Sequence, residues 1–273
     1  MADQLRRDGR MRMALLAVLT ACLLGAQPMT EAGAAEKAVA VRVAAAADLK
    51  FALDEIVRRY RQVRPGVDVS VTFGSSGLFF AQLSNGAPFD LYLSADGTYP
   101  RKLMEAGVAL PGSEFPYAVG RIVLWVPKES PLHVESSGLK ALTSESVKRI
   151  SIPNPAHAPY GKAAEAALKH YGLYDAVKGK LVMGQNAAQT AQFAQSRSAD
   201  AAIIPLSLAS APTLARDGRY WIIPLDAHPR LEQAGVLIKA SKATLEARLL
   251  AEFLTGPDAR AVLKQYGFIL PGE

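Results

Sequence analysis

Residues 67–85, VDVSVTFGSSGLFFAQLSN, give the clearest indication of the fold. An alternating apolar strand runs into the turn Gly74-Ser75-Ser76-Gly77, and an apolar-faced helix follows at once. This order places two hydroxyls and several free backbone N–H groups at a helix N-terminus, where the macrodipole favours negative charge. The turn contains no charged residue. It therefore predicts either a cradle of neutral donors for a small anion or, more simply, a helix start capped by serine.

Strand-like and helix-like segments alternate on both sides of this stretch, which predicts an α/β fold with mostly parallel sheets. The expected strands are residues 39–45, 67–73, 90–94, 119–127, 149–152, 180–183, 201–205, 221–225 and 235–238. The clearest expected helices of the later part are residues 162–171, 187–196, 244–254 and 257–266. The pattern of a βαβαβ unit followed by a second α/β unit predicts two lobes.

We expect lobe 1 to be built from two separate parts of the chain, with lobe 2 between them. Residues 35–117 would form the first part of lobe 1, residues 118–225 would form lobe 2, and residues 226–273 would return toward lobe 1. A ligand would then bind in a cleft between the lobes, where strand C-termini and helix N-termini of both lobes meet.

Composition and the N-terminal sequence indicate the cellular compartment of the protein and argue against one class of partner. The 273 residues are 50% hydrophobic and carry a formal net charge of +6 without basic runs in the later chain, so we expect no nucleic-acid binding. Residues 1–34 combine arginines, a short apolar run and the small-residue pattern Ala32-Gly33-Ala34, which is typical of a secretory signal peptide and predicts a periplasmic protein. Cys22 is the one cysteine and lies in a sequence similar to a lipoprotein box, so lipid anchoring at Cys22 is the less favoured alternative.

Four groups of segments, taken in order, resemble the periplasmic molybdate-binding proteins of ABC transporters. They are residues 44–49 (AAAADL), 74–77 (GSSG), the pair 85–96 (NGAPFDLYLSAD) and 154–161 (NPAHAPYG), and 256–268 (GPDA…YGF). The resemblance implies a two-lobed periplasmic solute-binding protein that binds molybdate or tungstate and delivers it to an ABC transporter permease in the membrane. It implies a monomer without catalytic activity and without a cofactor.

The resemblance also implies which residues bind the oxyanion. They are Ala47, Asp48, Ser75, Ser76, Tyr160 and Ala187. Molybdenum would be held as molybdate through Ser76, Tyr160 and Ala187, whose hydroxyl and N–H groups would donate to the oxygens of the anion. Neutral donors suit such a site, because a buried cation would add its own desolvation penalty.

Asp48 departs from the family pattern, in which Ser, Thr or Asn occupies the corresponding position. A carboxylate pointed at a dianion would be repelled strongly in a low-dielectric pocket. Asp48 could turn away and cap the helix that begins near Leu49, it could be protonated and donate a hydrogen bond, or the ligand could be another anion. We expect the cap, which is the simplest of the three interpretations.

Two alternative functions remain open. The first is a solute-binding protein for sulfate, phosphate or an organic anion, and the departure of Asp48 from the family pattern leaves this alternative open. The second is a secreted serine hydrolase that uses Ser76 or Ser137, since Ser137-Gly-Leu-Lys140 matches the Ser-x-x-Lys pattern of some acyl enzymes. The hydrolase is the weaker alternative, because the sequence suggests no base next to either serine.

Overall fold

The computed structural model of the chain describes residues 38–273. The expected signal peptide and Cys22 lie outside the described residues. Within residues 38–273, no helix is both long enough and apolar enough to cross a membrane.

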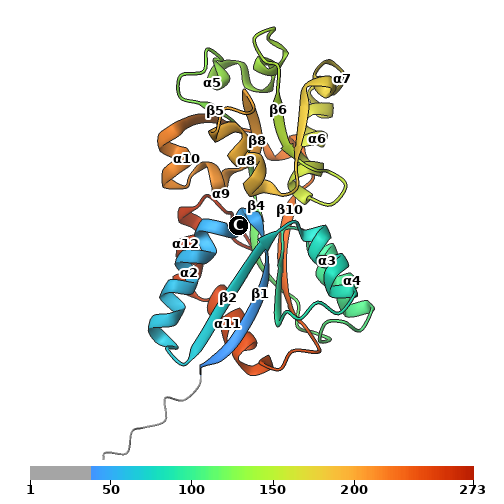
Figure 1. Cartoon of the computed structure of the whole chain (residues 1–273), viewed down its shortest axis with the longest axis vertical. Helices are drawn as coiled ribbons and strands as arrows, with labels where there is room; N and C mark the ends of the chain where they lie inside the picture. The colour runs from blue at the N-terminus through green and yellow to red at the C-terminus, as the bar shows by residue number, and fades with distance from the viewer. Residues whose placement is uncertain (1–37) are drawn as a thin grey trace, which may run out of the picture. The chain divides into compact units, whose positions relative to one another are not determined.

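The described residues form two five-stranded sheets, each packed against helices (Figure 1). Sheet 1 has the strand order β2 (Val67–Gly74), β1 (Val39–Ala46), β3 (Leu91–Ser94), β10 (Leu231–Leu237) and β4 (Phe115–Gly120). Sheet 2 has the order β7 (Leu181–Gly184), β6 (Ile150–Pro153), β8 (Ala201–Pro205), β5 (Ile122–Pro127) and β9 (Gly218–Ile222). Below, lobe 1 is sheet 1 with its helices and lobe 2 is sheet 2 with its helices.

Each lobe contains helices as well as its sheet. Those of lobe 1 are η1 (Ala47–Leu49), α2 (Lys50–Val63), α3 (Ser76–Ser84), α4 (Thr98–Glu105), α11 (Thr244–Thr255) and α12 (Pro257–Gln265). Those of lobe 2 are α5 (Val134–Ser137), η2 (Gly138–Thr143), α6 (Pro159–His170), α7 (Tyr174–Val177), η3 (Lys178–Lys180), α8 (Ala187–Gln195), α9 (Leu206–Ala209), α10 (Pro212–Asp217) and η4 (Leu225–Ala227).

The two-lobed α/β fold is confirmed, but both sheets are mixed where mostly parallel sheets were expected. β1 is parallel to β2 and β3, and β6 is parallel to β7 and β8. The antiparallel pairs all involve β10 or β5. These are the two strands that begin just after the chain passes from one lobe to the other.

The first passage between the lobes lies at Arg121. The apolar run 119–127 was expected to be one strand, and this prediction is wrong: β4 ends at Gly120 in sheet 1 and β5 begins at Ile122 in sheet 2. Both strands are buried, so the apolar pattern continues across the junction and does not reveal the change of sheet.

Apolar residues at the strand ends of lobe 1 join the cores of lobe 2. One buried cluster combines Ala46 and Ala95 of lobe 1 with β5, β6 and α6 of lobe 2. A second cluster combines Ala47 with α8 and β8. The ends of β1 and β3 therefore pack directly against lobe 2, and this packing positions the site described next.

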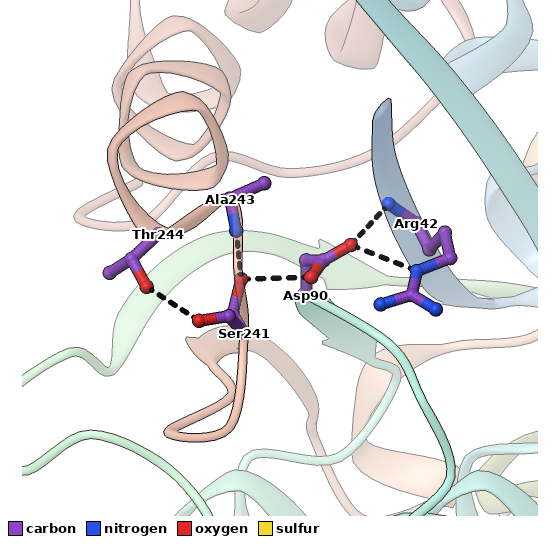
Figure 2. Close-up of polar contacts among 5 residues, drawn as sticks. All are labelled: Arg42, Asp90, Ser241, Ala243 and Thr244. Carbon is purple, nitrogen blue, oxygen red and sulfur yellow. Dashed lines mark hydrogen bonds and ion pairs between the residues drawn. The ribbon is translucent and has the colours of Figure 1, made fainter. Parts of the chain in front are cut away.

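A polar network at the other end of β1 and β3 secures lobe 1 (Figure 2). The buried carboxylate of Asp90 accepts hydrogen bonds from the backbone N–H of Arg42 (2.8 Å), from Arg42 Nε (3.2 Å) and from the Ser241 hydroxyl (2.8 Å). Burial alone would raise the pKa of Asp90, but these hydrogen bonds and the charge of Arg42 outweigh it and lower the pKa below its ordinary value of 3.8. The network joins β1 to the loop that leads into α11.

Candidate functional site: a cavity between the lobes

Among the strands that end at the junction of the lobes, four lead into helices whose first residues line the site. β1 leads into η1, β2 into α3, β6 into α6 and β7 into α8. β1 and β2 are parallel neighbours, as are β6 and β7, so each pair opens at the same edge of its sheet. This edge is where open α/β sheets bind ligands.

These helix starts surround one small cavity. Its empty volume, including its opening, is about 210 Å³. It is lined by Ala46, Ala47, Asp48, Gly74, Ser75, Ser76, Ala95, Ala158, Pro159, Tyr160 and Ala187. All six residues expected from the sequence are therefore brought together around a single space, and Asp48 is the one charged residue among those that line it.

Backbone N–H groups of three helices are available at this cavity. Ser76, Tyr160 and Ala187 lie in the first turns of α3, α6 and α8, where an N–H has no acceptor within its own helix. Among the described residues, none of the three N–H groups donates to another backbone carbonyl. α6 begins at Pro159, three residues before the expected start at 162, because proline is well suited to a first helical turn.

The two serines of the glycine turn have different roles. The Ser76 hydroxyl accepts a hydrogen bond from the N–H of Ala95 (3.0 Å), which leaves its own proton free to donate toward the cavity. Ser75 occupies the N-cap position of α3 but makes no side-chain cap bond. Its hydroxyl instead donates to the His157 carbonyl oxygen of lobe 2 at 2.6 Å. The simpler interpretation of the turn as a serine-capped helix start is therefore wrong.

His157 joins the lobes beside the cavity. Its Nδ1 lies 2.9 Å from Ser75 Oγ, and its carbonyl oxygen also accepts from the N–H of Gly77 at 2.9 Å. A Cβ at position 77 would lie 2.6 Å from that carbonyl oxygen, so only glycine allows this approach. Burial lowers the pKa of His157, which favours the neutral imidazole.

Asp48 does not cap a helix, so the expected cap is wrong. The residue lies in the middle of η1, where its side chain points to Tyr160 of lobe 2 and Gln233 of β10. Asp48 Oδ2 accepts from the Tyr160 hydroxyl at 2.8 Å and from Gln233 Nε2 at 2.7 Å. Gln233 Nε2 also lies 2.9 Å from the Tyr160 hydroxyl oxygen, which closes a three-membered network across the lobes.

Burial dominates the electrostatics of this network. The side chain of Asp48 is 1% exposed, and desolvation raises its pKa from 3.8 to about 6 despite the hydrogen bonds from Gln233 and Tyr160. Asp48 Oδ1 and Gln233 Oε1 are buried without a hydrogen-bond partner among the described residues. Burial, followed by the charge of Asp48, raises the pKa of Tyr160 and Tyr117 well above 10, so both remain neutral hydroxyls.

Gln233 is a site residue that the sequence analysis missed. The last strand of sheet 1 was expected at residues 235–238, but β10 runs from Leu231 to Leu237 and contains Gln233. Gly120 makes room for the network, because a Cβ there would lie 2.2 Å from the Tyr160 hydroxyl and 2.9 Å from Gln233 Nε2. Strand alternation could have identified it, because Gln233 shares the inward face of β10 with Leu231 and Gly235 while Glu232 faces outward.

The geometry of the serines does not support nucleophilic catalysis. The Ser76 hydroxyl accepts from the N–H of Ala95, and among the described residues no base lies within hydrogen-bond distance of it. The neighbouring Ser75 donates its proton to the His157 carbonyl and not to the imidazole. Ser137 and Lys140 are exposed on α5 and η2, and Ser137 lies outside the cavity.

Comparison with known proteins agrees with this architecture. Residues 41–269 match the family described as bacterial extracellular solute-binding protein. The molybdate-binding protein ModA of Azotobacter vinelandii is 37% identical over 86% of this chain and 91% of its own length, and that of Rhodobacter capsulatus is 34% identical over 76% and 79%. The solved structure of a periplasmic molybdate-binding protein of Azotobacter vinelandii superposes with a TM-score of 0.79 at 31% identity, covering 85% of this chain and 99% of that one. With two lobes, a cavity between them and relatives of this length and identity, the chain belongs to the bacterial extracellular solute-binding protein family, where it is related to the molybdate-binding proteins.

Proposed function

We propose that this protein binds molybdate or tungstate in the cavity between its lobes and delivers the anion to an ABC transporter permease. The observation that carries the proposal is the convergence of three helix N-termini and the Ser76 hydroxyl on one small cavity without lysine or arginine. The relatives named as molybdate-binding proteins support the choice of anion.

The chemistry of the donors fits a buried tetrahedral oxyanion. N–H groups at helix N-termini present partial positive charge that is fixed by the backbone and needs no reorganisation when the anion arrives. Ser76, Tyr160 and Ala187 approach from both lobes, so four oxygens of one ion can be contacted from several sides. Close packing around a cavity of this size fixes its dimensions, which allows it to discriminate by anion size.

Closure of the lobes would report that the anion is bound. The contacts of Asp48 with Tyr160 and of Ser75 with His157 join the lobes at the cavity, and an anion that bridges the same elements would favour the closed arrangement. The permease would recognise the closed form. We propose a periplasmic, monomeric carrier that needs no cofactor and catalyses no reaction.

A binding panel tests this proposal. Thermal unfolding of the protein without its signal sequence would be followed with molybdate, tungstate, sulfate, phosphate or no anion. A ligand that binds only the folded state raises the midpoint as its concentration rises. We expect shifts with molybdate and tungstate. A shift with sulfate, phosphate or an organic anion but none with molybdate or tungstate would reject the assignment.

A pair of serine variants localises the binding. Ser76→Ala removes a hydroxyl that lines the cavity, whereas Ser137→Ala removes an exposed hydroxyl outside the cavity. The molybdate-induced shift should shrink in the first variant and stay unchanged in the second. Equal shifts in both variants would show that the anion binds elsewhere.

A further inference from the structure

We propose that Asp48 couples oxyanion binding to proton uptake, so that each dianion enters the cavity with a proton held between the Asp48 carboxyl and an oxygen of the ligand. The inference rests on the proposed function and deepens it. The proton comes from the solvent: the buffer acid loses it, an O–H bond forms on the carboxyl, and no other bond changes.

The first support is the position of the carboxyl. Asp48 lines the cavity, is fully buried and has its Oδ2 already engaged by Tyr160 and Gln233. Its Oδ1 is buried and has no partner among the described residues. An unpartnered buried oxygen is costly, and a proton on Oδ1 would turn it into a donor that a ligand oxygen can accept.

The second support is the lack of a compensating cation. Asp48 forms no ion pair within residues 38–273. Lys50, two residues along the chain, pairs with Asp54 at 3.6 Å. The groups that face Asp48 from the surrounding elements are Tyr160 of α6, Tyr117 of β4, Gln233 of β10 and, at its carbonyl oxygen, Ser207 of α9. None of these groups carries a charge at neutral pH.

A dianion in this cavity would make an ionised Asp48 still less stable. Like charges a few Å apart repel each other strongly where water is excluded. Burial already raises the pKa of the carboxyl to about 6 against the hydrogen bonds that lower it, and the anion would raise it further. Above about pH 6 the free protein holds this carboxyl ionised and the complex holds it protonated, so binding must take up a proton.

Linkage gives the size of the effect. When one proton is taken up on binding, affinity falls by at most about tenfold for each unit of pH above the pKa of the free protein. The same proton favours the more basic oxyanion, because a stronger base accepts a stronger hydrogen bond from the carboxyl. Asp48 would thus be a specificity-determining residue that discriminates by basicity in addition to size.

Titration calorimetry tests the inference directly. Molybdate would be titrated into the protein at about pH 7.5 in two buffers of different ionisation enthalpy, PIPES and Tris, and the difference in heat gives the number of protons taken up. We expect an uptake near one proton at about pH 7.5 that declines toward zero below about pH 5, where the free protein is already protonated. Asp48→Asn keeps the shape of the side chain and should bind with no uptake and no pH dependence of affinity.

A second variant keeps the test decisive if Asp48→Asn does not fold. Tyr160→Phe removes a donor to the ionised carboxyl but retains the backbone N–H at the cavity, so the pH at which affinity begins to fall should move upward. Molybdate binding without proton uptake, or with the same uptake in Asp48→Asn, would refute the inference and leave the proposed function intact. Absence of binding by either molybdate or tungstate would refute both.

Discussion

Replacing Asp48 with asparagine should stabilise the protein in the absence of ligand at neutral pH. Burial raises the pKa of Asp48 from 3.8 to about 6, a difference of about two units, and each unit corresponds to about 1.4 kcal/mol. A carboxyl whose pKa is raised on folding binds more protons in the folded state than in the unfolded state. Its ionisation therefore opposes folding by up to about 3 kcal/mol once the pH is above the folded pKa.

The pH dependence follows from the same pKa values. Below the unfolded value of 3.8 the carboxyl is protonated in both states and costs nothing; as the pH rises from 3.8 through about 6, stability is lost. The amide side chain of the Asp48→Asn variant cannot ionise, so the free energy of unfolding of the variant minus that of the natural protein should grow over this window and then remain constant. The amide can still accept from Tyr160 and Gln233 through its oxygen.

Urea unfolding of both proteins, free of oxyanions, at a series of pH values would measure this difference. Subtracting the two curves cancels the groups that titrate alike in both proteins. A difference that stays flat between about pH 4 and pH 7, or a variant that is less stable at about pH 7.5, would show that the carboxylate is not destabilised by burial. Burial would then give Asp48 no reason to take up a proton when the anion binds.

Three further substitutions probe other parts of the structure. Asp90→Asn should change stability in the opposite direction from Asp48→Asn, because the pKa of Asp90 is lowered in the folded protein (Figure 2). The ionised Asp90 stabilises the fold above pH 3.8, and this stabilisation is lost as the pH falls through the lower folded pKa. The variant should therefore unfold at a lower urea concentration than the natural protein at neutral pH. Ser76→Ala should weaken molybdate binding by about ten- to hundredfold in calorimetry, the effect of one hydrogen bond to a charged ligand, and unchanged affinity would remove Ser76 from the site. Gly77→Ala places a Cβ 2.6 Å from the His157 carbonyl oxygen, and this overpacking of about 1–3 kcal/mol opposes closure of the lobes. The variant should therefore bind molybdate about 5- to 150-fold more weakly. Equal affinity, together with small-angle scattering that shows the ligand-saturated variant to be as compact as the natural protein, would contradict this.

Local pattern was sufficient to predict the elements that surround the cavity. The strand and helix within residues 67–85 correspond to β2 and α3, and α8 begins at Ala187 as expected. These elements are specified by signals within about ten residues, such as alternation, glycine turns and helix starts. The sequence alone therefore predicts the strand-to-helix turns after β2 and β7, which converge at the lobe junction.

The side-chain contacts between the two lobes could not be predicted in the same way. Gln233 lies 185 positions from Asp48, and Tyr160 lies 112 positions from it, so no local signal connects them. The division of the run 119–127 at Arg121 was also hidden, because both strands are apolar on both faces. Tertiary contacts decide these features, and a single sequence does not record which contact is formed.

The two wrong cap predictions have one physical cause. A serine or aspartate at a helix start can satisfy the first N–H groups itself, and a side chain that does so removes those donors from any ligand. Asn186 caps α8 by accepting from the N–H of Gln189 at 3.0 Å, which still leaves the N–H of Ala187 for the cavity. Ser75 and Asp48 instead direct their side chains to His157 and to Tyr160 in the opposite lobe.

Two residues of lobe 1 that could cap helices are thus used to join the lobes, and the helix N-termini at the cavity stay open. For Ser75 this exchange replaces one hydrogen bond with another at little cost. For Asp48 it buries a carboxyl without a cation beside it among the described residues, and desolvation makes the ionised form unfavourable. A dianion and an ionised Asp48 repel each other in this cavity, whereas a protonated Asp48 can donate a hydrogen bond to the dianion. The position of this one side chain therefore makes the protonation state of the site part of its selectivity.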